Sequence, residues 1–168
     1  MQIQCNVKLN DVIHQYRQKW LFYTYLASHL SQASIGLLNV SRSFYERGAA
    51  ADAAAKSLVE YQTLRGGKLH FAEVKPPCNL HFNQGIGHAL RTAYEAACAH
   101  EEETCHAIAE AHRMAMQNED HHFAHFLLNC TSTQTKVVFE LHRLHSQIRD
   151  FGENALASVT FDRWLAEC

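Results

Sequence analysis

Three histidines lie close together in the second half of the chain, at His121, His122 and His125. Neutral imidazole is the commonest metal-binding side chain, and it suits borderline ions such as Zn2+, Cu2+ and Ni2+. The group therefore predicts either a nitrogen-rich metal site or three solvated surface histidines. The sequence alone leaves both interpretations open.

Two Glu-x-x-His patterns offer another route to metal chemistry, Glu103 with His106 and Glu119 with His122. On a helix, residues three apart face the same way, and such pairs bind metals inside helical bundles. With 13 histidines in the chain, however, a pattern of this kind is expected by chance. The two pairs are therefore weak support for a metal site.

Six cysteines could form disulfides or remain thiols. They are Cys5, Cys78, Cys98, Cys105, Cys130 and Cys168. No Cys-x-x-Cys pair and no secretion signal accompanies them, which favours reduced cysteines within helices. Oxidative cross-linking within or between subunits is the alternative.

The composition indicates one mostly helical domain, residues 1–168. Two prolines and seven glycines leave few places to interrupt long helices, and the length supports a core without disulfides or a structural metal. A net charge of -2 argues against nucleic acid or a membrane surface as a partner. Because no apolar run suits a signal peptide or a transmembrane helix, we expect a cytoplasmic protein.

Apolar residues at three- and four-residue spacing predict four long helices and a short fifth one. The first follows a cap at Asn10 or Asp11 and ends near Gln32. The other predicted helices span residues 37–64, 84–117, 120–151 and 154–167. Gly66 is expected to end the second helix in a left-handed conformation. The following segment, residues 67–82, is too long for a hairpin and suits a crossover along a bundle.

The link between the second and third predicted helices carries the strongest family signal. It contains Arg65-Gly66-Gly67 where the second helix ends and Lys75-Pro76 before the third begins. Together with residues 118–126 and Phe161-Asp162-Arg163, these segments resemble ferritins along nearly the whole chain. The resemblance implies an all-α, ferritin-like four-helix bundle with one long crossover and a short fifth C-terminal helix. It also implies a homo-oligomer, a hollow 24-mer cage.

The resemblance maps the iron-oxidising site of ferritins onto this chain. Ligand positions fall on Ala51 and Ala54 in the second helix, Trp20 in the first and Thr135 in the fourth. Only Glu101 in the third helix keeps a carboxylate that could bind metal, and one carboxylate cannot hold two irons. Trp20 is expected to fill the space of a bridging carboxylate. We therefore expect a protein that is not an enzyme, in which removal of Glu101 leaves iron oxidation unchanged.

The second helix also departs from ferritins that lack the oxidation site. Light-type subunits keep glutamates on the cavity face of this helix to nucleate mineral. Here that face reads Ala49, Ala50, Ala51, Ala53 and Ala54. Glu46 and Asp52 are the remaining acids nearby, so neither the light-type nor the heavy-type pattern is matched.

The start of the fourth helix lines the threefold pores of ferritins with two acidic residues, which map onto His125 and Leu128. A ring of imidazoles does not attract Fe2+ as an acidic pore does. Three symmetry-related histidines would instead supply a tripodal nitrogen site. The resemblance thus predicts Zn2+ or another divalent metal at His121, His122 or His125, provided that these side chains face the pore.

The resemblance favours a light-type ferritin subunit that sequesters ferric iron, alone or co-assembled with a catalytic ferritin subunit. Iron is then stored cargo rather than a catalytic cofactor. The alternative is an iron-poor cage with a protective, chaperone-like binding role, as in artemin. The artemin tail resembles Phe161-Asp162-Arg163-Trp164-Leu165-Ala166. An active ferroxidase is a third interpretation, and it needs ligands that this chain lacks.

Overall fold

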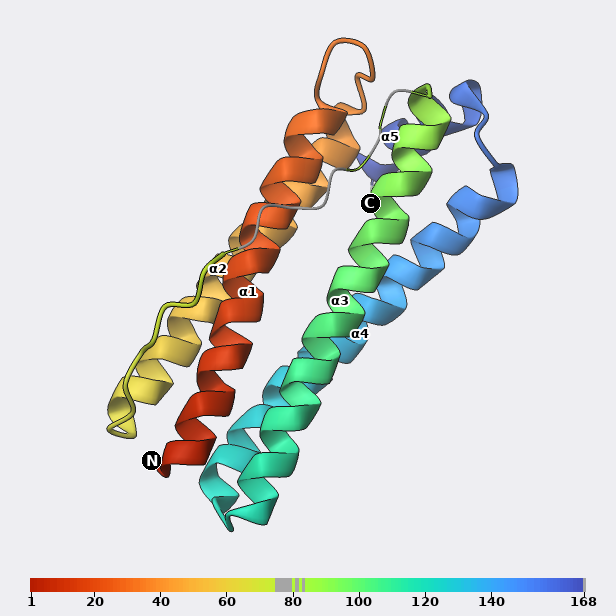
Figure 1. Cartoon of the computed structure of the whole chain (residues 1–168). Helices are drawn as coiled ribbons and strands as arrows, with labels where there is room; N and C mark the ends of the chain where they lie inside the picture. The colour runs from red at the N-terminus through yellow and green to blue at the C-terminus, as the bar shows by residue number, and fades with distance from the viewer. Residues whose placement is uncertain (75–79, 81, 83, 168) are drawn as a thin grey trace.

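Five helices make up the computed structural model, which describes residues 1–74, 80, 82 and 84–167 (Figure 1). The helices are α1 (Ile3–Leu30), α2 (Leu38–Leu64), α3 (Ile86–Gln117), α4 (His121–Phe151) and α5 (Ala155–Leu165). No strand occurs among the described residues. The predicted all-α bundle with a short C-terminal helix is confirmed.

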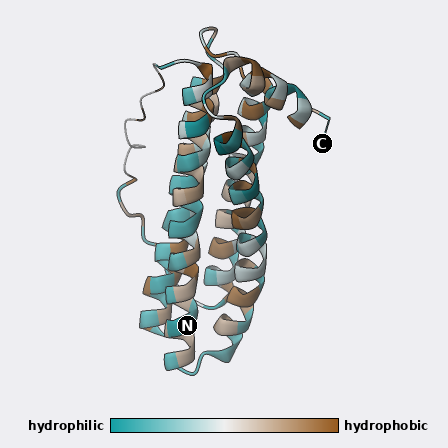
Figure 2. Ribbon diagram, turned by 90° about the vertical axis from the view of Figure 1, so that its right-hand side faces the viewer, coloured by the Kyte–Doolittle hydropathy of each residue, from teal (hydrophilic) through white to brown (hydrophobic). Residues whose placement is uncertain are grey.

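The four long helices form two antiparallel hairpins, α1 with α2 and α3 with α4, which pack side by side (Figure 1). Each long helix alternates between hydrophilic and hydrophobic residues along its length (Figure 2). Such helices are stabilised chiefly by burying their apolar faces against one another. The buried apolar residues form two clusters, one around Phe44 and Tyr94 and one around Leu58 and Phe123.

The end of α2 follows the prediction. Gly66 has φ +69°, and its N–H donates to the carbonyl of Thr63, while Gly67 N–H donates to the carbonyl of Gln62. This pair of hydrogen bonds closes a Schellman motif, in which Gly66 adopts a left-handed conformation that side chains with a Cβ rarely take. The chain then turns back along the α1–α2 hairpin toward the start of α3 (Figure 1).

The predicted start of α1 is wrong, because the helix begins at Ile3 and not after Asn10 or Asp11. The side chain of Asn10 binds the crossover instead of capping the helix. Its Oδ1 accepts from His70 N–H at 2.9 Å, and its Nδ2 donates to the carbonyl of Lys68 at 3.0 Å. Polar residues early in α1 therefore fasten the crossover.

Asp120 caps α4 as predicted, and its carboxylate accepts from Phe123 N–H at 3.0 Å. Both of its oxygens also bind the guanidinium of Arg65 at 3.0 Å, which joins the end of α2 to the start of α4. A second carboxylate acts across the bundle. Asp162 of α5 accepts from the N–H groups of Asn39 and Val40 at 2.9 and 2.8 Å, and so caps α2.

Among the described residues, no helix combines the length and apolar character needed to cross a membrane.

Candidate functional site

A polar layer lies between the two apolar clusters, and Glu101 of α3 is at its centre. Its side chain is 1% exposed, so a carboxylate here needs partners. Tyr23 of α1 donates its hydroxyl to Oε1 at 2.5 Å. Lys19 of α1 donates to Oε2 at 2.6 Å, and the amide of Gln134 on α4 donates to the same oxygen. Three of the four long helices therefore meet at one carboxylate.

Lys19 is the cation of this layer. Its side chain is buried, with its ammonium bound to Glu101 and, at 3.2 Å, to Oε1 of Gln134. The ammonium also lies 4.6 Å from the centre of the Tyr16 ring, a favourable cation–π contact. An ammonium group has three N–H donors. The contacts with Glu101, with Gln134 and with the Tyr16 ring together match that number.

The electrostatics of the pair follow from burial and mutual attraction. Burial alone would raise the pKa of Glu101. The charge of Lys19 and the hydrogen bonds from Lys19, Tyr23 and Gln134 outweigh burial and lower that pKa below its ordinary value. Burial lowers the pKa of Lys19, while Glu101 opposes the shift. Burial also raises the pKa of Tyr23, so its hydroxyl remains a donor. The lowered pKa of Glu101 favours its carboxylate form, which pairs with the amino group of Lys19.

A second ion pair crosses the bundle nearby. Arg47 of α2 lies 3.1 Å from Glu140 of α4, with the arginine side chain 16% exposed. Lys19 and Glu101 join α1 to α3, whereas Arg47 and Glu140 join α2 to α4. The two hairpins are thus tied together by cations on one and carboxylates on the other.

Two residues that the resemblance maps onto the iron-oxidising site, Trp20 and Thr135, do not lie at the centre of the bundle. Trp20 is 41% exposed and does not fill the centre of the bundle, where its neighbour Lys19 lies. Thr135 is exposed and donates its hydroxyl to the carbonyl of Thr131, while its neighbour Gln134 reaches Glu101. One residue turns a helix by about 100°, so an offset of one selects a different face.

The alanines of α2 divide between the interior and the surface. Ala51 is buried in the cluster around Leu58 and Phe123, and Ala54 packs against that cluster, as expected of positions that face a bundle centre. Ala49, Ala50 and Ala53 are exposed. Asp52, the nearby acid, is paired with Arg17 of α1 and with Lys56 at 2.7 Å. Its charge is therefore already balanced.

This donor set does not fit a pair of iron ions. Within the part of the chain that the structure describes, Glu101 is the only carboxylate in the central layer, and it is balanced by an ammonium group. Iron prefers several oxygen ligands with some imidazole. Among the described residues, no cluster of three or more His, Cys, Asp or Glu side chains is placed to hold a metal ion.

The structure separates the three histidines at the start of α4. His122 turns toward α2, where its Nδ1 lies 3.0 Å from the hydroxyl of Tyr61. His121 and His125 are exposed, and neither makes a hydrogen bond or ion pair among the described residues. The predicted pore site involves neighbouring copies, so it stays a prediction. Glu103, His106 and Glu119 are also exposed.

Sequence reasoning missed Lys19, Tyr23 and Gln134. A signal for Lys19 was present, because it falls within the apolar stripe of α1. That stripe consists of Val12, Tyr16, Lys19, Tyr23 and Leu26, all of them buried. A lysine at helical spacing inside such a stripe indicates a buried charge, which requires an anion from another helix.

The comparison with protein families matches residues 7–151 to the ferritin-like domain. Three similar curated proteins are ferritins. The lower-subunit ferritin of Aquarana catesbeiana is 27% identical over 73% of this chain and 68% of its own length. The Ferritin-1 heavy chain of Schistosoma mansoni is 23% identical over 95% and 90%. The chloroplastic Ferritin-3 of Glycine max is 24% identical over 89% and 58%.

Proposed function

The chain belongs to the ferritin family, and on that premise we propose that it is an iron-sequestering subunit without an iron-oxidising centre. Ferric iron is then stored cargo held by the assembly. Fe2+ is then oxidised by a catalytic ferritin subunit with which this chain co-assembles. Without such a subunit, oxidation occurs slowly and has no protein catalyst.

One observation supports this proposal: the ammonium of Lys19 occupies the space beside Glu101, the one carboxylate that the resemblance keeps from the iron-oxidising site. It is 2.6 Å from Glu101 and 3.2 Å from the amide oxygen of Gln134. A metal cation would have to displace a charged group covalently attached to α1. It would gain one carboxylate in return, because the facing positions on α2 are alanines. Binding of two iron ions at this position is therefore strongly disfavoured.

Assembly into a closed homo-oligomer is the second part of the proposal. Exposed apolar side chains on a soluble bundle commonly mark contacts with other subunits. Leu156 of α5 is 77% exposed and Trp164 is 37% exposed, and both line a groove of about 680 Å³ between α4 and α5. Phe139 of α4 is 71% exposed. A 24-mer is the arrangement that the family resemblance suggests.

A second candidate function is an iron-poor cage that binds and protects other molecules. The exposed alanines of α2 favour it, because Ala49, Ala50 and Ala53 offer no oxygen ligand to a growing mineral. Asp52 does not supply the missing oxygen ligands, because its negative charge is already balanced by Arg17 and Lys56.

Iron content measured per assembly separates the two functions. The purified protein is loaded with Fe2+ in air, alone and after co-assembly with a catalytic ferritin subunit. The proposed storage role requires that the mixed assembly form a large ferric core. It also requires that the assembly of this chain alone take up iron slowly. If the mixed assembly holds iron only in proportion to its catalytic subunits, the protective role is favoured instead.

A further inference from the structure

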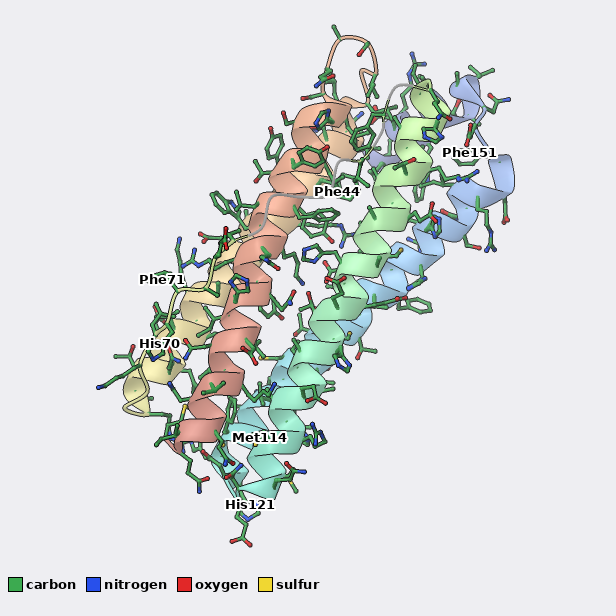
Figure 3. The ribbon with its side chains drawn as sticks, in the orientation of Figure 1. Phe44, His70, Phe71, Met114, His121 and Phe151 are labelled. Carbon is green, nitrogen blue, oxygen red and sulfur yellow. The ribbon has the colours of Figure 1, made fainter. Side chains whose placement is uncertain are left out.

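Five aromatic side chains form a continuous row of ring contacts from the centre of the bundle to its surface. In order they are Tyr23 of α1, Phe44 of α2, Tyr94 of α3, and Phe161 and Trp164 of α5. Successive ring centroids are 5.6, 5.2, 5.9 and 5.7 Å apart. Aromatic rings in contact have centroids about 4.5–7 Å apart, so every step of the row is a direct contact. Phe44 lies in the half of the bundle that carries α5 (Figure 3).

The two ends of this aromatic row differ in their exposure to solvent. Tyr23 is completely buried, and Phe44 and Tyr94 are each 1% exposed. Trp164 is 37% exposed and borders the groove between α4 and α5, where a small solute reaches its indole. The row therefore connects an exposed indole with a phenol that solvent does not reach.

Three of the five rings are of the kinds that lose an electron to mild one-electron oxidants. Indole and phenol are oxidised far more easily than the benzyl rings of Phe44 and Phe161. The two phenylalanines instead fill the space between the oxidisable rings, and electrons tunnel more readily through packed rings than across solvent. An electron can therefore move from Tyr23 to Tyr94, and from Tyr94 to Trp164, in two short steps.

The buried end of the row also has a place for a proton. A phenol loses an electron easily only when it gives up its proton as well. The hydroxyl of Tyr23 donates to Oε1 of Glu101 at 2.5 Å, so a proton acceptor is within hydrogen-bond reach. Lys19 and Gln134 bind the other oxygen, Oε2, and leave Oε1 to the tyrosine. Tyr23 is thus suited to be the end point of oxidation that begins at Trp164.

We propose that the aromatic row carries oxidising equivalents from Trp164 to Tyr23, and so protects the exposed indole from permanent oxidation. The oxidant is a small inorganic radical such as the carbonate radical anion, which takes one electron from Trp164 and becomes carbonate. Tyr94 passes an electron to Trp164 and receives one from Tyr23, whose phenolic proton moves to Glu101. The products are carbonate, a phenoxyl radical at Tyr23 and a protonated Glu101, while Trp164 and Tyr94 are restored. This activity is separate from iron storage.

Pulse radiolysis of the assembled protein in azide solution tests the proposal. The azidyl radical takes an electron from indole in preference to phenol and becomes azide. Trp20→Phe removes the other of the two tryptophans, so the indolyl radical then forms at Trp164 alone. In this variant the indolyl absorbance should fall as the phenoxyl absorbance rises, at a rate that does not depend on protein concentration. The rate should be lower in D2O, because a proton moves together with the electron.

Two further changes in the Trp20→Phe background locate the path. Tyr94→Phe keeps the shape of the ring but removes the oxidisable phenol, so it should abolish the conversion. Tyr23→Phe should abolish it as well, because the row then lacks the phenol with a proton acceptor. Tyr45→Phe is the matched control, since this exposed tyrosine is not part of the row, and the conversion should be unchanged.

Four results would each overturn the proposal. They are the absence of conversion in Trp20→Phe, conversion that survives either Tyr94→Phe or Tyr23→Phe, a rate that rises with protein concentration, and an equal rate in D2O. The third would indicate that the radical passes between molecules rather than along the row. Circular dichroism of each variant verifies that the helices are retained.

Discussion

Lys19 of α1 and Glu101 of α3 are 82 residues apart in sequence, yet their charged atoms lie 2.6 Å apart in the centre of the bundle. Both side chains are almost completely excluded from solvent. Breaking a buried ion pair on one side is costly, because the remaining charge has no partner. Replacing both members by neutral groups of similar size removes that penalty. The pair is therefore the natural subject of a double-mutant cycle.

Each single substitution, Lys19→Met or Glu101→Gln, should lower the free energy of unfolding by about 3–5 kcal/mol. The double variant should be more stable than either single variant, because it leaves no unpaired charge in the core. Urea denaturation of all four proteins measures the coupling. Additive losses would mean that the two groups do not interact as the geometry indicates. This expectation also refines the one drawn from sequence: loss of Glu101 matters for stability even where it does not affect iron chemistry.

Acid should weaken the fold partly through Glu101. Burial alone would raise its pKa, but Lys19, Tyr23 and Gln134 hold the folded-state pKa below the ordinary value of 4.5. A carboxyl with a lowered pKa in the folded state adds stability above its unfolded pKa. That contribution is lost as the pH falls from about 4.5 through the lower folded-state value. Stability should therefore decline with falling pH in this window.

The variant Glu101→Gln isolates this contribution. It should be less stable than the wild type at neutral pH, and the difference should shrink as the pH falls below 4.5. Urea midpoints measured between neutral pH and strong acid check both statements. A difference that stays constant across this range would exclude Glu101 as the source.

Iron oxidation should be no faster with the wild-type protein than in buffer alone. Adding ligands on α2 through Ala51→Glu and Ala54→His should not create activity, because Lys19 still balances Glu101. The absorbance of Fe3+ after mixing with Fe2+ in air gives the rate. A catalytic ferritin subunit is the positive control. Rapid and saturable oxidation by the wild-type assembly would contradict the proposed function.

Two helical glycines should respond differently to alanine. A Cβ at Gly87 of α3 would lie 2.3 Å from the carbonyl carbon of Glu153, in the backbone between α4 and α5. A Cβ at Gly48 of α2 would meet Tyr23 at an ordinary 3.4 Å. Gly87→Ala should therefore cost about 1–3 kcal/mol through overpacking, and Gly48→Ala less than that. Thermal unfolding of the two variants provides the comparison, and equal losses would refute it.

Helix spacing, the Gly66 cap and the Asp120 cap could all be read from the sequence, because each depends on residues a few positions apart. The start of α1 could not be read from the sequence, because Asn10 does not cap the helix. Its side chain is hydrogen-bonded to the crossover segment that follows α2. The same holds for Asp162, whose carboxylate caps a helix more than one hundred residues earlier in the chain.

The sequence by itself determined the helical bundle, the long crossover and the alanine-rich stretch of α2, because these follow from local periodicity and residue type. Only the tertiary structure decided which of two neighbouring residues faces the centre, Lys19 or Trp20 on α1, and Gln134 or Thr135 on α4. Neighbouring side chains diverge by about 100° around a helix, and only packing against the other helices sets the rotation of each one. That rotation placed the ammonium group of Lys19 beside the carboxylate of Glu101.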